Sequence, residues 1–195
     1  MDVNKLTDYK FGVFDSDLLP DVVFHMRERD DTIDDPNPFK WVRKTTSELF
    51  AGKTVLIFGL PGAFTPTCSN SQLPGYEELY DEFIAAGIDE VYCTSVNDAF
   101  VMHCWKQQQG VTKVKMLPDG NGEFAKGLGM LVDKSNLGFG NRSWRYAMVV
   151  KDLEIQHVFE EQGYPRDLHP TDPYGVSSPV HVLSTLQGEE ALENE

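Results

Sequence analysis

The chain has 195 residues, of which 41% are hydrophobic and 25% are charged, and this length suffices for one domain with a substantial core. Its 31 acidic and 17 basic side chains give a formal net charge of −14, which disfavours binding to nucleic acid or to an anionic membrane. No apolar stretch approaches the roughly 18 residues of a membrane span, and the N-terminus lacks the apolar core of a signal peptide. The sequence therefore predicts a soluble cytoplasmic protein.

The first predicted elements are a strand, a turn and a short helix. Residues 21–28 alternate between apolar and polar side chains as a strand does, and residues 29–39 are rich in Asp, Asn and Pro, which form turns. Thr45 and Glu48 have the spacing of a capping box. They predict a short helical turn that ends at Gly52.

A continuous apolar run follows at residues 53–59 and is typical of a central strand that is covered on both faces. The segment after Cys68 has apolar side chains at helical spacing, namely Leu73, Tyr76, Leu79, Tyr80 and Phe83. Pro74 is expected to bend or restart this helix, and Gly87 is expected to end it.

The middle of the chain continues the alternation of strands and helices. Residues 88–96 form another apolar run and predict a buried strand. Asn97 is expected to cap a helix that ends at Gly110. Residues 114–120 then predict a strand and a turn, and residues 122–130 predict a short helix.

The C-terminal part is expected to contain two strands and a helix. Residues 144–161 predict two strands joined by a turn, and the last helix is expected to begin near Ser177 or Ser178 with Pro179 in its first turn. The whole order predicts an α/β domain with a mixed sheet, compatible with a thioredoxin-like core that carries insertions.

The three cysteines, Cys68, Cys93 and Cys104, are odd in number and far apart. They match neither a disulfide framework nor the close ligand spacing of a zinc site. The glycines of residues 119–130 fit neither a dinucleotide-binding loop nor a P-loop. We therefore expect no metal and no nucleotide cofactor.

Cys68 is expected at the start of a helix, because Thr65 is a natural N-cap and Pro66 a natural first helical residue. The sulfur would then face unpaired backbone N–H groups and the positive end of the helix dipole. The alternative is that Thr65 only caps the helix and that Cys68 is a small buried apolar residue.

A reactive thiolate at this position needs a cation as well. Lowering the pKa of a thiol from about 8.5 to about 6 takes roughly 3.4 kcal/mol, whereas a helix end typically supplies about 0.3–1 kcal/mol. Arg145 is the first candidate because it leads into an apolar strand, on the same face as Ala147 and Val149. The alternative for Arg145 is a surface ion pair, and Arg142 is the next candidate cation.

The residues around Cys68 resemble those of the peroxiredoxins. Pro61, Thr65 and Cys68 fit the PxxxTxxC motif of that family, and GFGNRSWRY at residues 138–146 is similar to a second family motif. The resemblance is to the branch of type II plant, atypical mammalian and bacterial peroxiredoxin–glutaredoxin proteins. It covers residues 18–187, which leaves residues 1–17 as an N-terminal extension of unknown role and residues 188–195 as an acidic tail.

The resemblance implies a thioredoxin-like fold and a thiol-dependent peroxidase, with an antioxidant role. Cys68 resembles the peroxidatic cysteine, whose thiolate attacks a hydroperoxide and becomes a sulfenic acid. Thr65 resembles the residue that holds the sulfur and the peroxide, and Pro61 resembles the proline that shields the reacting oxygens. Arg145 resembles the arginine that polarises the peroxide and favours the thiolate. The resemblance implies a homodimer, and it implies no metal, haem or flavin.

The residue that resolves the sulfenic acid is open at this point. Atypical mammalian members have a cysteine in the C-terminal region, where this chain has Ser177 and Ser178. Cys93 matches the second cysteine of plant type II members, but its alternative is a buried core residue. Cys104 is expected to be a packing residue of its helix. The resemblance implies glutathione, glutaredoxin or thioredoxin as the reductant.

Two other functions remain as alternatives. A redox-regulated thioredoxin-like binding or chaperone module would need neither the threonine nor the arginine beside its cysteine. A thiol–disulfide oxidoreductase usually has a CxxC pair, whereas Cys68 is followed by Ser69, Asn70 and Ser71.

Overall fold

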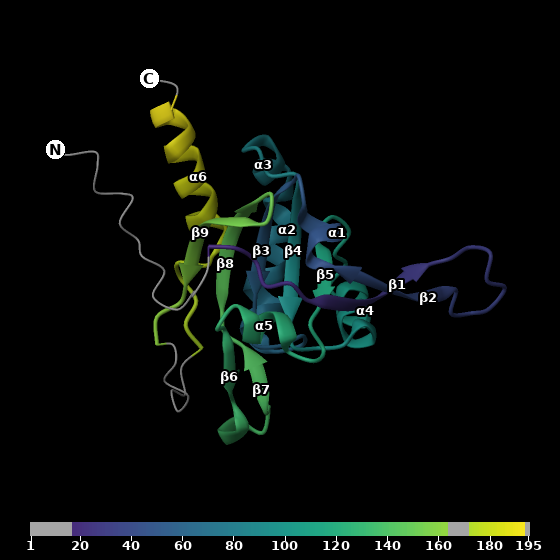
Figure 1. The fold of residues 1–195 in the computed structure, drawn as a ribbon. Coiled ribbons are helices and arrows are strands. Elements are labelled where there is room, and N and C mark those ends of the chain that lie inside the picture. Colours follow the sequence, from purple (N-terminus) through teal and green to yellow (C-terminus); the bar gives the residue numbers. More distant parts are fainter. Residues whose placement is uncertain (1–16, 164–171, 194–195) are drawn as a thin grey trace.

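The computed structural model describes residues 17–163 and 172–193 (Figure 1). Its centre is a sheet of five strands in the order β5 (Lys115–Pro118), β4 (Glu90–Ser95), β3 (Thr54–Gly59), β8 (Tyr146–Lys151) and β9 (Glu154–Glu160). Strands β3, β4 and β5 are parallel, and β8 and β9 pair antiparallel. The predicted mixed sheet of a thioredoxin-like α/β fold is confirmed.

Both faces of the sheet are covered, which explains the continuous apolar sequence of β3. One face packs against α2 (Leu73–Glu78), α3 (Tyr80–Ala85), α4 (Ala99–Gln108) and α6 (Pro179–Glu193). The other face packs against α1 (Thr46–Phe50), α5 (Glu123–Gly127) and β1 (Val23–Arg29). Leu56 and Phe58 point into the first layer, and Val55 and Ile57 point into the second.

Two small hairpins extend from this core (Figure 1). Strand β1 pairs with β2 (Phe39–Thr45), and β6 (Leu131–Asp133) pairs with β7 (Asn141–Ser143) around a short 3₁₀ turn at Ser135–Leu137. The sequence did not predict β2, β6 or β7. Strand β2 has no fully buried residue and lacks a clean apolar alternation, and the other two strands have only three residues each.

The N-terminal ends of α1 and α4 test two of the capping residues that the sequence predicted. Thr45 and Glu48 form the predicted capping box at the start of α1. For α4, however, the prediction of Asn97 as the cap was wrong, because the side chain of Asp98 accepts from the first N–H groups. Both residue types cap helices well, and the Asn97 side chain instead accepts hydrogen bonds from the Ala63 backbone and the Ser95 hydroxyl.

The predicted extension and tail overlap the limits of the described residues. Residues 1–16 of the N-terminal extension lie outside them. Helix α6 begins at Pro179, next to the start predicted near Ser177 or Ser178. It runs to Glu193, so most of the segment interpreted as an acidic tail from residue 188 has a helical backbone. Among the described helices, none combines the length and the apolar character that crossing a membrane requires.

Candidate active site

Cys68 lies in the first turn of a helix that begins at Pro66, as the sequence predicted. The Thr65 carbonyl accepts from the Ser69 N–H at 3.0 Å and so starts the helical hydrogen bonding. The Thr65 hydroxyl donates to the Gly62 carbonyl at 2.8 Å and accepts no hydrogen bond from a described helical N–H. Thr65 therefore precedes the helix as predicted, but its side chain ties the helix start to the loop that follows β3 and does not cap it. Pro61 is half-buried in the same loop.

The turn that carries Cys68 is a π-helix over Cys68–Gln72. The Leu73 N–H donates to the Cys68 carbonyl, five residues back, and Pro74 has no N–H with which to continue an ordinary ladder. The helix therefore changes from a π-helix to an α-helix next to Pro74, where the sequence predicted a bend or a restart. Cys68 and Gln72 are both fully buried at this turn.

Arg145 immediately precedes β8 and lies on the sheet face that was predicted for it. Ala147 and Val149 belong to the same apolar cluster as Cys68, whereas Tyr146 and Met148 point into the opposite layer. The alternation along β8 therefore directs Arg145 toward the helix that carries the cysteine.

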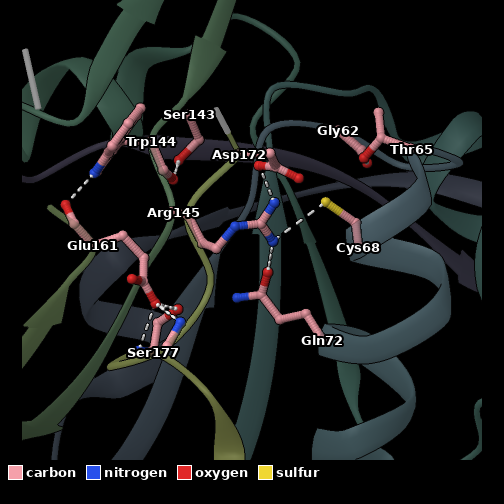
Figure 2. Close-up of polar contacts among 11 residues, drawn as sticks. Gly62, Thr65, Cys68, Gln72, Ser143, Trp144, Arg145, Glu161, Asp172 and Ser177 are labelled. Carbon is pink, nitrogen blue, oxygen red and sulfur yellow. Dashed lines mark hydrogen bonds and ion pairs between the residues drawn. The ribbon is translucent and has the colours of Figure 1, made fainter. Parts of the chain in front are cut away.

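The guanidinium of Arg145 contacts three side chains, two from the Cys68 turn and one from residue 172 (Figure 2). Its Nη1 lies 3.6 Å from Cys68 Sγ and also donates to Gln72 Oε1. Its Nη2 forms an ion pair with the Asp172 carboxylate. Arg145 is only 1% exposed, so this cation is almost completely removed from water.

The charge of Arg145 is maintained in spite of this burial. Burial opposes the charged form, but Cys68 and Asp172 outweigh it and raise the pKa of Arg145 above its ordinary value. A desolvated charge acts on its neighbours more strongly than an exposed one, because less water screens it. Arg145 is therefore a permanent cation beside the sulfur.

Arg142, the other candidate cation, is directed elsewhere. Its Nη1 donates to the Val96 carbonyl and its Nε donates to the Phe139 carbonyl, each at 3.1 Å. It supports the loops around the site, and the structure brings Arg145 and Cys68 together instead.

Comparisons with known proteins agree with this geometry. The Redoxin family model matches residues 17–172. A peroxiredoxin of Sinorhizobium fredii, y4vD, is 56% identical over 169 residues, which are 87% of this chain and 89% of that protein. The chain belongs to the peroxiredoxin family. Its branch includes plant type II and hybrid peroxiredoxins, and it is therefore a thiol peroxidase that reduces peroxides.

One further sequence relative and one solved structure are also similar to this peroxiredoxin. The hybrid peroxiredoxin hyPrx5 of Haemophilus influenzae is 48% identical over 86% of this chain and 64% of that protein. The solved structure of the Plasmodium falciparum antioxidant protein, described as a 1-Cys peroxiredoxin, has a TM-score of 0.80 and 37% identity over 88% of this chain and 98% of that one.

The other two cysteines of this peroxiredoxin are placed differently from Cys68. Cys93 is fully buried on β4, between Phe58 of β3 and Met116 of β5. Burial first, and the nearby Cys68 second, raise the pKa of Cys93 well above its ordinary value. Cys104 is exposed on α4, so the expectation that it packs inside the helix layer was wrong. The inward side chains of α4 are instead Ala99, Met102 and Trp105.

Two residues of this arrangement were missed by the sequence analysis. Gln72 follows Cys68 by one turn, and this spacing could have suggested a shared face. Asp172 lies far along the chain from both Cys68 and Arg145, and no local pattern marks it as their neighbour. Only the tertiary structure places its carboxylate on the arginine.

Proposed function

We propose that Cys68 is the peroxidatic cysteine of this peroxiredoxin and that Arg145 stabilises its thiolate and polarises the peroxide. The observation that carries this proposal is the 3.6 Å separation between Arg145 Nη1 and Cys68 Sγ, both of them buried. Thr65, whose hydroxyl lies at the start of the same helix, holds sulfur and peroxide in line, and Pro61 shields the reacting oxygens from water.

In the proposed step, the Cys68 thiolate attacks one oxygen of the hydroperoxide and the O–O bond breaks. The sulfur becomes a sulfenic acid, and the other oxygen leaves with its electron pair and takes up a proton to give water or an alcohol. Negative charge therefore moves from the sulfur to the leaving oxygen. Arg145 and the free N–H groups of the first helical turn are donors for that charge.

For the return to the thiolate, we propose a one-cysteine cycle. Glutathione attacks the sulfenic acid, which releases water and leaves a mixed disulfide on Cys68, and a second thiol then frees Cys68 as the other product becomes a disulfide. The second thiol belongs to glutathione or glutaredoxin, and thioredoxin is the alternative reductant. The raised pKa of Cys93 supports this choice, because the thiolate is the attacking form of a cysteine.

The geometry of Cys93 is the second support. Its backbone is paired on both sides within the sheet, so it cannot leave β4 without breaking strand pairing. A Cys68–Cys93 disulfide would need Cα atoms within about 7 Å and an unwound first turn at Cys68. The atypical two-cysteine cycle with Cys93 as the resolving residue remains the alternative.

We further propose that this peroxiredoxin acts in the cytoplasm as a homodimer built around the loops next to the site. Phe64, in the loop between β3 and Cys68, is 49% exposed. Aromatic residues are enriched in the cores of protein–protein interfaces, so we assign Phe64 to this contact.

The substitution Cys68→Ser tests the peroxidatic role. Serine is nearly isosteric with cysteine but cannot form the sulfenic acid, so peroxide consumption with dithiothreitol should fall to background while the far-ultraviolet circular dichroism stays unchanged. Cys104→Ser is the matched control and should keep most of the activity, because this thiol is exposed on α4. Substantial turnover in Cys68→Ser would transfer the chemistry to Cys93 or Cys104.

A further inference from the structure

We propose that Asp172 is a positioning residue that fixes the Arg145 guanidinium and limits how much of its positive charge the Cys68 sulfur experiences. This inference rests on the proposed function, in which Arg145 acts on Cys68. It concerns the segment 172–178, where the sequence offers Ser177 and Ser178 in place of a resolving cysteine. In the structure, this segment carries the carboxylate that pairs with Arg145.

The two ends of the guanidinium are held by different partners (Figure 2). Nη1 faces Cys68 Sγ and Gln72 Oε1, whereas Nη2 faces the Asp172 carboxylate. The Nε of Arg145 is buried and has no hydrogen-bond partner among the described residues. Gln72 and Asp172 are therefore the two side chains that fix the plane of the guanidinium relative to the sulfur.

The segment that carries Asp172 is anchored by a buried carboxylate. Glu161 Oε1 accepts from the Gly175 N–H at 2.7 Å, from the Ser177 N–H at 2.9 Å and from the Ser177 hydroxyl at 2.8 Å. The N–H of Glu161 itself donates to the Arg145 carbonyl at 3.1 Å. One residue thus joins the backbone of Arg145 to the segment that presents its counter-ion.

Two further contacts hold this segment against the site. The Tyr76 hydroxyl, from α2, donates to the Ser177 carbonyl at 2.7 Å. The ring of Tyr174 lies 5.6 Å from the Arg145 guanidinium carbon, a favourable cation–π distance. The segment that carries Asp172 is therefore held in place by several contacts, although the Asp172 side chain itself is 45% exposed.

The electrostatic consequence has a definite sign. A carboxylate on the far side of the guanidinium partly neutralises the charge that favours the thiolate. Asp172 thus fixes the position of the Arg145 guanidinium but reduces how strongly Arg145 stabilises the Cys68 thiolate. Removing the Asp172 charge should therefore make the Cys68 thiolate easier to form. It should also let the Arg145 guanidinium move away from the position in which it polarises the peroxide.

The other ionisable groups around the pair do not obscure this test. Burial raises the pKa of Tyr174 to about 12 and raises those of Tyr76 and Cys93 well above their ordinary values. These three groups stay neutral near pH 7. Glu161 and Arg142 also lie near the pair. Glu161 Oε1 accepts hydrogen bonds from Gly175 and Ser177, and Arg142 donates to the Val96 and Phe139 carbonyls, and neither residue is changed in the Asp172 variants.

The experiment compares Asp172→Asn, Asp172→Ala and Asp172→Glu, all in a Cys104→Ser background so that the exposed thiol does not titrate. The matched control is Asp31→Asn, which removes another aspartate–arginine ion pair, with Arg29 at 2.6 Å, on the exposed turn of the β1–β2 hairpin. The thiolate absorbance is measured against pH, and the peroxide rate constant is measured at a pH where Cys68 is fully ionised.

We expect Asp172→Asn and Asp172→Ala to lower the midpoint of the thiolate titration by about half a pH unit to one unit, since Asp172 is partly exposed and therefore screened. At full ionisation, their peroxide rate constant should fall several-fold. Asp172→Glu should keep the midpoint of the parent protein, because it retains the charge. Asp31→Asn should match the parent protein in both measurements.

An unchanged or higher midpoint in both neutral variants would overturn the inference, as would an equal shift in Asp31→Asn. Asp172→Ala decides the question if Asp172→Asn does not fold by circular dichroism. If the proposed function itself is wrong, Arg145→Gln would leave both the thiolate titration and the peroxide rate constant unchanged. If Arg145→Gln has its expected effect while the neutral Asp172 variants do not, only the role of Asp172 is refuted.

Discussion

The reactivity proposed for Cys68 depends on one desolvated cation more than on its helix. A helix terminus typically contributes about 0.3–1 kcal/mol, too little for the thiolate fraction that peroxide attack requires. Arg145 is almost fully buried and faces the sulfur at 3.6 Å, where water screens its charge weakly. The helix start then serves chiefly to place the sulfur and to supply N–H donors.

Replacing Arg145 by glutamine should therefore shift the thiolate titration to higher pH and slow peroxide reduction by about two to three orders of magnitude, the usual cost of losing a charge-stabilising donor. Stopped-flow measurement of the second-order rate constant and the thiolate absorbance against pH would check this. Arg142→Gln is the matched control, because its guanidinium binds the Val96 and Phe139 carbonyls. Equal effects of the two substitutions would contradict the assignment.

Single residues could be predicted from sequence where a local rule places them. Thr65 and Pro66 locate Cys68 at a helix start, and alternation along the strand locates Arg145 on the matching face. Asp172 could not be predicted, since its position depends on the tertiary contacts of Glu161. Cys104 was misplaced because the α4 sequence has apolar side chains on more than one face, and Phe100 is exposed there as well.

The site is assembled where the end of β3 lies beside the start of β8. Gly59, the last residue of β3, pairs with Tyr146 of β8, next to Arg145. A Cβ at Gly59 would lie 2.3 Å from Tyr146 Cε1, and that ring is fully buried. The absence of a side chain at Gly59 therefore leaves room for the buried ring of Tyr146, the residue that follows Arg145.

The substitution Gly59→Ala should destabilise the protein by about 1–3 kcal/mol, the usual cost of forcing extra volume into a packed core. It should also lower the peroxidase rate, since Tyr146 must move and Arg145 adjoins it. Urea unfolding and steady-state kinetics would measure the two effects. Gly188→Ala in α6 is the control: no atom lies within 4 Å of its Cβ position, so it should be neutral or slightly stabilising. A Gly59→Ala protein as stable and active as the parent would contradict this packing account.

Elements were predictable from sequence where burial imposes a strong pattern. Strands β3 and β4 are covered on both faces, and their continuous apolar runs predicted them. The π-helical turn at Cys68–Gln72 was predicted only as an irregularity at Pro74, because its exact form depends on how the helix packs. The β6–β7 hairpin, by contrast, leaves Leu137 and Phe139 exposed and carries no such pattern.

The loops near the site carry exposed apolar side chains, and we propose that a partner subunit packs there. Phe64 lies two residues after Gly62, and a Cβ at Gly62 would lie 3.8 Å from Arg142 Nη1. Arg142 in turn binds the carbonyl of Phe139, which is 40% exposed. Loops from two separate parts of the chain thus present aromatic rings around one region.

We expect the protein to be a homodimer by light scattering at micromolar concentration, with Phe64→Glu and Phe139→Glu shifting it toward the monomer. A buried charge at an apolar contact costs several kcal/mol, so either substitution should weaken association strongly. Trp41→Glu is the matched control: Trp41 is 58% exposed, but it lies on the β1–β2 hairpin. A monomeric parent protein, or a dimer disrupted only by Trp41→Glu, would contradict the proposed interface.

Mass spectrometry after one equivalent of hydrogen peroxide, with and without glutathione, tests most directly whether Cys68 performs a one-cysteine peroxidase cycle. Without glutathione, we expect one added oxygen on Cys68 and unmodified Cys93. With glutathione, we expect a single glutathione adduct on Cys68, and Cys93→Ser should retain most glutathione-dependent turnover. A Cys68–Cys93 disulfide as the main product, with turnover lost in Cys93→Ser, would contradict the account and establish the two-cysteine cycle.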